Sequence, residues 1–233
     1  MKFNLNKCFV LKVTNARKPK SHSYILNNTK LTETDSHTYL GVELSKNLKW
    51  NKHVDRVTAK SNRTLGFIKR NLNKCTEDIK SLAYCSLVRP SLEYCSSVWD
   101  PHTNDLISQV EAVQRRAARF VKNDYGRLSN VSSRLKELGW STLAERRRIA
   151  RLTTFFKAHE GYLSIPVRDL LHPVTRLTRR SHNKSYIEIS TNKDSFKYSF
   201  LPRTLTDWNS LPGNLVNTQD PKSFKAKLQQ HYQ

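Results

Sequence analysis

Lysine and arginine recur at helical spacing in two stretches of this sequence, opposite apolar residues. At about 100° per residue, a helix over 105–122 places Arg115, Arg119 and Lys122 on the side away from its apolar residues. A helix over 50–74 repeats this arrangement, with basic positions at Lys52, Arg56, Lys60, Arg63, Arg70 and Lys74. Such side chains neutralise phosphates with little preference for base sequence. Both stretches therefore predict contact with a nucleic-acid backbone.

A third helix is expected from Thr142 onward, because Thr142 and Glu145 have the spacing of a capping box. Ile149 lies on its apolar face. Arg147 and Arg151 lie on the other side, so we expect both of them to contact the same anion as the first two helices.

Phe67 is an exception in the second stretch, because it projects from the basic side of the expected helix. One interpretation is that it stacks on a base or sugar, as aromatic residues among Lys and Arg often do. The other is that it packs on a neighbouring helix. The sequence leaves both interpretations open.

The overall charge favours a polyanionic partner. The chain of 233 residues has 41 Lys and Arg against 19 Asp and Glu, a formal charge of +22. Without neutralisation, such an excess destabilises the compact state. Nucleic acid is the first candidate and an anionic membrane the second, and acidic proteins or simple solvation are further alternatives. No apolar run reaches the roughly 18 residues of a spanning helix, and the start has no signal-peptide pattern. We expect an intracellular protein without a membrane partner; nucleus and cytoplasm are not distinguished.

The sequence offers few residues whose types and spacing could carry out catalysis. Metal-dependent phosphoryl transfer needs carboxylates that converge on paired cations about 4 Å apart. Glu33, Asp35 and Glu43 come nearest to such a set, and we interpret them as solubilising charges. The cysteines have no zinc-ligand spacing, so we expect reduced, buried thiols at Cys8, Cys75, Cys85 and Cys95. We predict no metal site and no cofactor in this chain.

The elements that must position these residues define an α+β fold, predominantly α. A strand over 8–13, a hairpin at Asn27-Asn28 and a strand over 38–44 predict a small antiparallel sheet. Helical periodicity then predicts a bundle with short connections, from helices over 50–74, 77–88, 92–99 and 105–122.

The signals weaken toward the end of the chain. Helices are predicted over 131–138 and from 142, strands over 186–189 and 196–200, a helical turn over 203–208 and a last helix over 221–232. The basic segment 176–184 is expected to be a loop. The domains would be 1–45 with the sheet, 46–122 with the bundle, and 123–233 with the mixed region.

Several segments in order carry a resemblance that covers essentially the whole chain. They are MKFNLNKC, SHTYLGVELSKNLKWNKHVDRV, SLVRPSLEYCSSVWDP, VQRRAARFVKNDY and FLPRTLTDWNSLP. The sequence resembles the carboxy-terminal part of reverse transcriptases of non-LTR retrotransposons, of the jockey and CR1 kind. The resemblance implies that residues 1–13 correspond to motif D at the edge of the polymerase palm, with Lys7 at the position associated with the incoming nucleotide.

The resemblance also implies roles for the segments that follow. Tyr39, Leu40 and Gly41 look like motif E, the primer grip, and residues 46–122 look like the thumb, which holds the template/primer duplex. The implied partners are RNA, DNA or RNA/DNA hybrid.

The sequence departs from this family at the catalytic carboxylates, an (F/Y)xDD motif and an earlier aspartate, because no Asp-Asp pair occurs in it. The chain is then a fragment, a mis-split gene model or a domesticated remnant, and we expect no polymerisation by it alone. Mg²⁺ would belong to the complete polymerase. The missing palm and fingers are a further expected partner.

Overall fold

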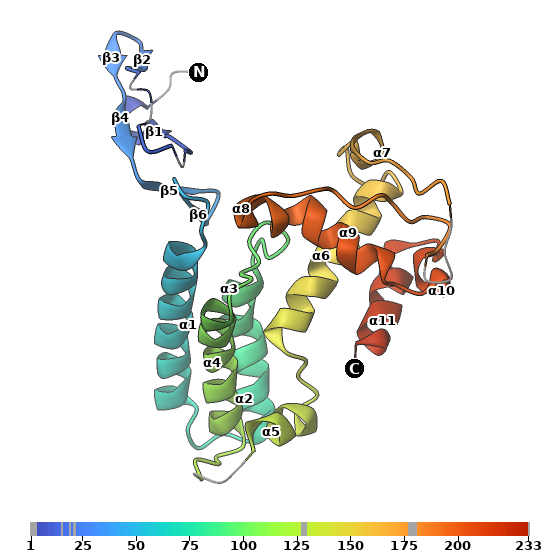
Figure 1. Ribbon diagram of the computed structural model, residues 1–233. Helices are drawn as coiled ribbons and strands as arrows, with labels where there is room; N and C mark the ends of the chain where they lie inside the picture. The colour runs from blue at the N-terminus through green and yellow to red at the C-terminus, as the bar shows by residue number, and fades with distance from the viewer. Residues whose placement is uncertain are drawn as a thin grey trace. The chain divides into compact units, whose positions relative to one another are not determined.

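The chain folds as an α+β protein in which helices predominate, as the sequence predicts (Figure 1). The computed structural model describes residues 4–14, 16–18, 20, 22–126, 130–176 and 181–232. They form two units, Met1–Val57 and Thr58–Gln233. This division differs from the predicted domains, because the bundle and the carboxy-terminal region belong to one unit.

The first unit contains short strands in two-stranded sheets. A 3₁₀ turn over Leu5–Lys7 precedes them. The strands are β1 (Phe9–Leu11), β2 (Ile25–Leu26), β3 (Thr29–Lys30), β4 (Thr32–Thr34), β5 (Ser36–Tyr39) and β6 (Val42–Ser45). The pairs β2–β3 and β5–β6 are antiparallel, as predicted for the sheet, whereas β1 pairs with β4 in parallel. Helix α1 (Asn51–Asn71) begins in this unit.

Two turns explain the local path of these strands. Asn27 and Asn28 have φ values of 48° and 58°, which confirms the predicted hairpin between β2 and β3. The predicted single strand over 38–44 is wrong. Leu40 and Gly41, with φ of 44° and 82°, reverse the chain between β5 and β6. A left-handed conformation at two consecutive residues produces a tight hairpin turn, which a continuous strand cannot contain.

The second unit starts with a helical bundle. After α1 come α2 (Glu77–Ala83), a π-helical segment (Tyr84–Val88), α3 (Arg89–Glu93) and α4 (Asn104–Val121). Pro90 does not interrupt this rod, contrary to the prediction, because it lies in the first turn of α3, where a missing N–H is tolerated. The predicted helix over 92–99 is also wrong, since α3 ends at Glu93.

The interior of the bundle is organised around Tyr84. Its ring stacks on Trp140 with centroids 4.4 Å apart, and its hydroxyl donates to Gln114 Oε1 at 3.0 Å. Gln114 Nε2 in turn donates to the carbonyl of Ser141 at 2.9 Å. The side chain of Gln114 in α4 therefore fixes the segment just before the helix at Leu143–His159 against the bundle.

The remaining helices pack around one central helix. They are α5 (Val131–Glu137), α6 (Leu143–His159), α7 (Val167–Leu170), α8 (Asp194–Lys197), α9 (Phe200–Asn209), α10 (Gly213–Val216) and α11 (Pro221–His231). The capping box of Thr142 and Glu145 is confirmed. Helix α6 contacts α3 and α4 as well as α9 and α11, so it joins the bundle to the carboxy-terminal core.

Two predicted strands are absent from the described part of this region. Phe196 lies in α8 and Phe200 begins α9, while Tyr186 makes one isolated bridge to Pro173. Aromatic residues favoured a strand, but β-propensity depends on context. Trp208 is buried and its helix, α9, packs on α6. This packing favours a helix that begins at Phe200, three residues before the predicted start at Arg203. Residues 177–180 of the predicted basic loop lie outside the described residues.

The cysteines differ from the expectation of burial. Cys8, Cys75, Cys85 and Cys95 are free thiols, and each is half-buried.

Candidate nucleic-acid interface

Helix α1 carries an exposed row of basic side chains around one aromatic residue. Leu65 and Ile68 on its apolar face are buried. This packing leaves the opposite face to solvent, with Lys60, Arg63, Phe67, Arg70 and, just after the helix, Lys74. At 1.5 Å per residue, about 15 Å of helix separates Lys60 from Arg70.

Helix α4 presents arginines on its own exposed side. Val113, Ala117 and Phe120 face the core, so Arg115 and Arg119 project into solvent. Nη2 of Arg115 donates to the carbonyl of Ser108 at 3.2 Å, which holds this side chain along the helix surface.

The two helices meet along a polar seam. Gln109 Nε2 donates to Thr58 Oγ1 at 3.3 Å, and Arg116 Nη1 donates to Asn62 Oδ1 at 2.8 Å. Burial and the positive charge of Arg116 lower the pKa of Lys69. The seam therefore brings two cationic side chains, Lys69 and Arg116, close enough to repel each other.

Sequence reasoning missed the two cations of this seam, Lys69 and Arg116. The basic positions taken from helical periodicity did not include either residue. Their adjacency to Arg70 and Arg115 was the only available signal.

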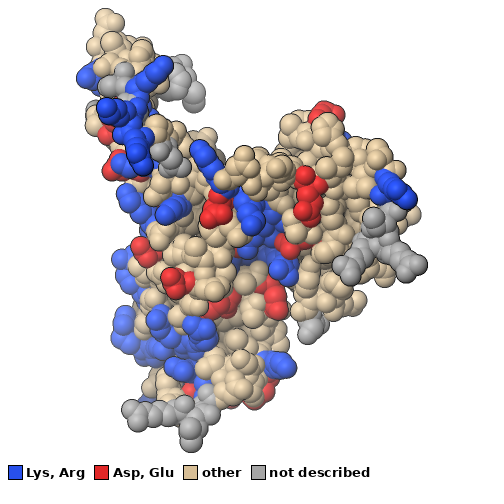
Figure 2. Space-filling view, in the orientation of Figure 1, with Lys and Arg blue, Asp and Glu red and all other residues tan. Residues whose placement is uncertain are grey.

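The exposed cations of both helices form one basic face (Figure 2). It gathers at the lower left of that view, over α1 and α4. Within the described parts of the chain, its side chains form no ion pair with a carboxylate. We call it the basic face, and it comprises Lys60, Arg63, Arg70, Lys74, Arg115 and Arg119. Its charge is therefore not neutralised internally.

Lys122 does not belong to this face. Its Nζ lies 2.9 Å from Glu77 Oε2 and 3.5 Å from Glu137 Oε2. The hydrogen bond to Glu77 raises the pKa of Lys122. The prediction of a phosphate contact is corrected for this residue, because its ammonium already connects α2 and α5 to the end of α4.

Lys52 and Arg56 lie in the first unit and contact its hairpin. Lys52 Nζ donates to Ser36 Oγ at 3.0 Å, and Arg56 Nη1 donates to Thr38 Oγ1 at 3.2 Å. Arg56 also donates to the carbonyl of Gly41. Both side chains are exposed but tie the β5–β6 hairpin to the start of α1.

The residues that the resemblance singles out are exposed. Lys7 lies at the end of the 3₁₀ turn. Tyr39 and Leu40 at the β5–β6 turn are 63% and 73% exposed, and Gly41 beside them is exposed too. Tyr39, Leu40 and Gly41 belong to the turn of the β5–β6 hairpin, and Lys7 precedes β1.

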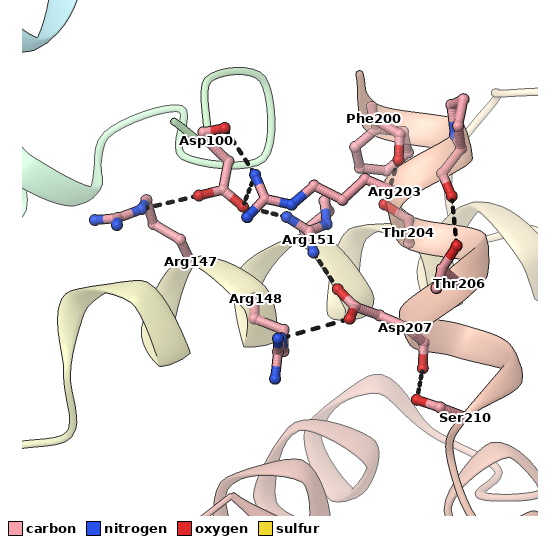
Figure 3. A network of polar contacts seen from close by, with 11 residues as sticks. Asp100, Arg147, Arg148, Arg151, Phe200, Arg203, Thr204, Thr206, Asp207 and Ser210 are labelled. Carbon is pink, nitrogen blue, oxygen red and sulfur yellow. Dashed lines mark hydrogen bonds and ion pairs between the residues drawn. The ribbon is translucent and has the colours of Figure 1, made fainter. Parts of the chain in front are cut away.

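Arg147 and Arg151 are not on an exposed face, and the prediction for them is wrong. Their side chains are 0% and 2% exposed. Arg147 Nε donates to Asp100 Oδ1 at 3.1 Å, and Arg151 donates to both Asp100 and Asp207 (Figure 3). A charge on the expected polar side of a helix can be buried when carboxylates compensate it.

The same network includes two further arginines (Figure 3). Arg203 Nη1 lies 3.1 Å from Asp100 Oδ2 and donates to the Asp100 carbonyl at 2.8 Å. Arg148 Nε lies 3.6 Å from Asp207 Oδ1. The network links the loop after α3 to α6 and α9, so its role in this structure is to hold the second unit together.

Among the residues that the structure describes, no three His, Cys, Asp or Glu side chains come together as a metal site requires. No helix in the described part of the chain is long and apolar enough to cross a membrane.

The fold and the site thus define a predominantly helical α+β protein with an exposed basic face on two adjacent helices. Comparison with known proteins adds no relative: no family model, curated protein or solved structure matches the chain.

Proposed function

We propose that this chain binds the backbone of RNA, DNA or RNA/DNA hybrid through the basic face of α1 and α4. The observation that supports this most is the absence of internal ion pairs from those cations among the described residues. Elsewhere in the second unit, exposed or buried arginines such as Arg146 and Arg148 have carboxylate partners. A cluster of uncompensated cations lowers its own repulsion by binding phosphates.

The resemblance to non-LTR retrotransposon reverse transcriptases makes the proposal more specific. In that setting the bundle would act as a thumb that holds the template/primer duplex, without the catalytic carboxylates. The isolated chain should then give only background primer extension. Template-dependent synthesis by this chain would contradict that part of the proposal.

The exposed apolar surface of the first unit supports a polymerase palm and fingers as partner. Of the apolar side chains described before α1, only Val42 is buried. A two-stranded parallel pair such as β1–β4 is not stable alone, because parallel sheets are normally covered on both faces. A protein partner would cover this surface.

A salt titration tests nucleic-acid binding directly. The affinity of the chain for a mixed-sequence duplex is measured by fluorescence anisotropy over a range of salt concentrations. If about six phosphates are neutralised, log K should fall against log salt with a slope near −5. The absence of measurable binding at low salt would refute the proposal.

A charge-reversed variant locates the binding surface. Arg63→Glu with Arg119→Glu should weaken binding and flatten the salt slope. The matched control is Lys222→Glu with Lys225→Glu, because these exposed lysines of α11 lie outside the basic face and the change in net charge is the same. Equal losses in the two variants would show a non-specific charge effect instead.

One observation favours a second candidate function, a scaffold that binds proteins. Large apolar side chains are exposed at Ile79 and Leu82 of α2, at Leu87 of the π-helical segment, and at Tyr94 and Val98 after α3. Large exposed apolar surface often marks a protein interface. A complex with an acidic protein that survives nuclease and is lost on Leu82→Ser with Leu87→Ser would favour this function over nucleic-acid binding.

A further inference from the structure

Phe67 lies at the centre of the basic row on α1 with its ring open to solvent. The side chain is 56% exposed. Arg63 lies one turn before it and Arg70 one turn after it, and both are exposed. No aromatic ring of the described residues stacks on Phe67. More than half of the Phe67 side chain is therefore open to solvent and available to a ligand.

A phenyl ring contributes nothing to phosphate binding, because it has no charge and no hydrogen-bond donor. Within a duplex the faces of the bases are stacked on one another, so they are closed to a side chain. An unpaired base has a free face, and stacking of aromatic residues on such faces between basic residues is how single strands are bound without sequence preference.

We propose that the α1 part of the basic face binds an unpaired strand, with one base stacked on Phe67. This inference rests on the proposed function and specifies its ligand as single-stranded RNA or DNA, or the unpaired end of a duplex. Arg63 and Arg70 bind the phosphates on either side of the stacked base, and Lys60 and Lys74 extend the contact along the strand. The arginines of α4 remain available for a second segment of backbone.

The row has the geometry of a linear site. Lys60, Arg63 and Arg70 are spaced three and seven positions apart in sequence, which places them on one side of the helix, and Lys74 follows just after its end. The length from Lys60 to Arg70, about 15 Å, suits a short extended run of nucleotides. Four neutralised phosphates of a single strand correspond to a salt slope near −3.

The experiment separates stacking from charge. Affinities of the full chain are measured for an unstructured single strand and for the duplex formed with its complement, each at several salt concentrations. Phe67→Ala should lower single-strand affinity about tenfold and leave its salt slope unchanged, because stacking releases no counterions. Duplex affinity should stay within about twofold, and Phe67→Trp should retain single-strand binding.

The control is Tyr162→Ala, because Tyr162 is 55% exposed, a value close to that of Phe67, and lies after α6, away from the basic face. This variant should bind both nucleic acids like the unchanged chain. Thermal unfolding of each variant by circular dichroism verifies that both are folded.

Three results would overturn the inference. If Phe67→Ala leaves single-strand affinity unchanged while the duplex still binds, the proposed function stands and the stacking role fails. If single-strand and duplex affinity fall equally, the ring does not distinguish an unpaired base. If the unchanged chain binds neither nucleic acid at low salt, the proposed function fails and the inference fails with it.

Discussion

Arg147 Nε lies 3.1 Å from Asp100 Oδ1, and both residues are buried. The Asp100 carboxylate also accepts a hydrogen bond from Arg151, and Arg203 Nη1 lies 3.1 Å from Asp100 Oδ2. One carboxylate therefore faces three guanidinium groups, which stay charged in proteins at any ordinary pH. This relationship makes Asp100 the residue on which the charge balance of the second unit depends.

Replacement of Asp100 should destabilise the fold strongly. We expect Asp100→Asn to lower the free energy of unfolding by about 3–5 kcal/mol, because a neutral amide leaves buried cations without compensation. Urea unfolding monitored by circular dichroism measures this. The control is Asp105→Asn in the exposed first turn of α4, where only the helix-dipole contribution of up to about 1 kcal/mol is lost. A similar effect of both changes would contradict the importance of the network.

Removal of a buried arginine should change stability, whereas removal of an exposed arginine of the basic face should change nucleic-acid binding. We expect Arg151→Ala to lower stability by several kcal/mol, because Asp100 and Asp207 lose a buried partner. The salt slope of nucleic-acid binding should stay unchanged in that variant, measured where it is folded. Arg63→Ala should do the reverse, with stability within about 0.5 kcal/mol and the slope reduced by about 1. A flatter slope in Arg151→Ala would mean that this residue contacts phosphate after all.

The first unit should lose stability as the pH falls below neutrality. Burial, together with the positive charge of Arg56, lowers the pKa of His53 from 6.5 to about 4, and its Nδ1 accepts the backbone N–H of Glu43 at 3.1 Å. Between pH 6.5 and 4 the unfolded chain binds a proton at His53 that the folded chain does not, so folding becomes less favourable through this window.

His53→Asn tests this prediction, because an asparagine oxygen can accept the same N–H without titrating. The decrease in melting temperature from pH 6.5 to pH 4 should be smaller in this variant than in the unchanged chain. Glu43 also titrates with a lowered pKa, through its hydrogen bond with Thr38, so some decrease should remain. Identical pH profiles would exclude His53 as a source of the pH dependence.

Gly66 offers a stabilising change. It lies inside α1 with a helical backbone, and a Cβ there would meet only Arg70 Nη1 at 3.6 Å, an ordinary contact. Gly66→Ala should raise stability by about 0.5–1 kcal/mol, because alanine loses less backbone entropy in a helix. Thermal and urea unfolding measure the gain. Gly139→Ala is the contrasting change, since φ of +63° there makes a side chain unfavourable.

Most helices were predictable because their signals are local. The apolar periodicity of α4, the capping box of α6 and the Asp220-Pro221 start of α11 all depend on residues within one or two turns. The exposed positions of α1 were predictable for the same reason. Local signals also explain the hairpin at Asn27 and Asn28, since both tolerate positive φ.

What could not be predicted depends on contacts between distant segments. Arg147 and Arg151 have the spacing of an exposed face, and only the approach of Asp100 and Asp207, 47 and 56 residues away, makes their burial possible. Lys122 could not be placed for the same reason, because its partner Glu77 lies 45 residues before it. An isolated acid among apolar residues, such as Asp100 after Trp99, was the available sign of a buried ion pair.

The network around Arg151 also constrains how the chain is made. Asp100 and Arg151 leave the ribosome well before Asp207, which lies 56 positions after Arg151 and is its second carboxylate partner. Until α9 emerges, α6 has an arginine, Arg151, that is buried in the folded protein but lacks one of its carboxylate partners. The packing around α6 is therefore complete only after α9 has been synthesised, and a nascent chain stopped before α9 would expose this arginine to chaperones and proteases.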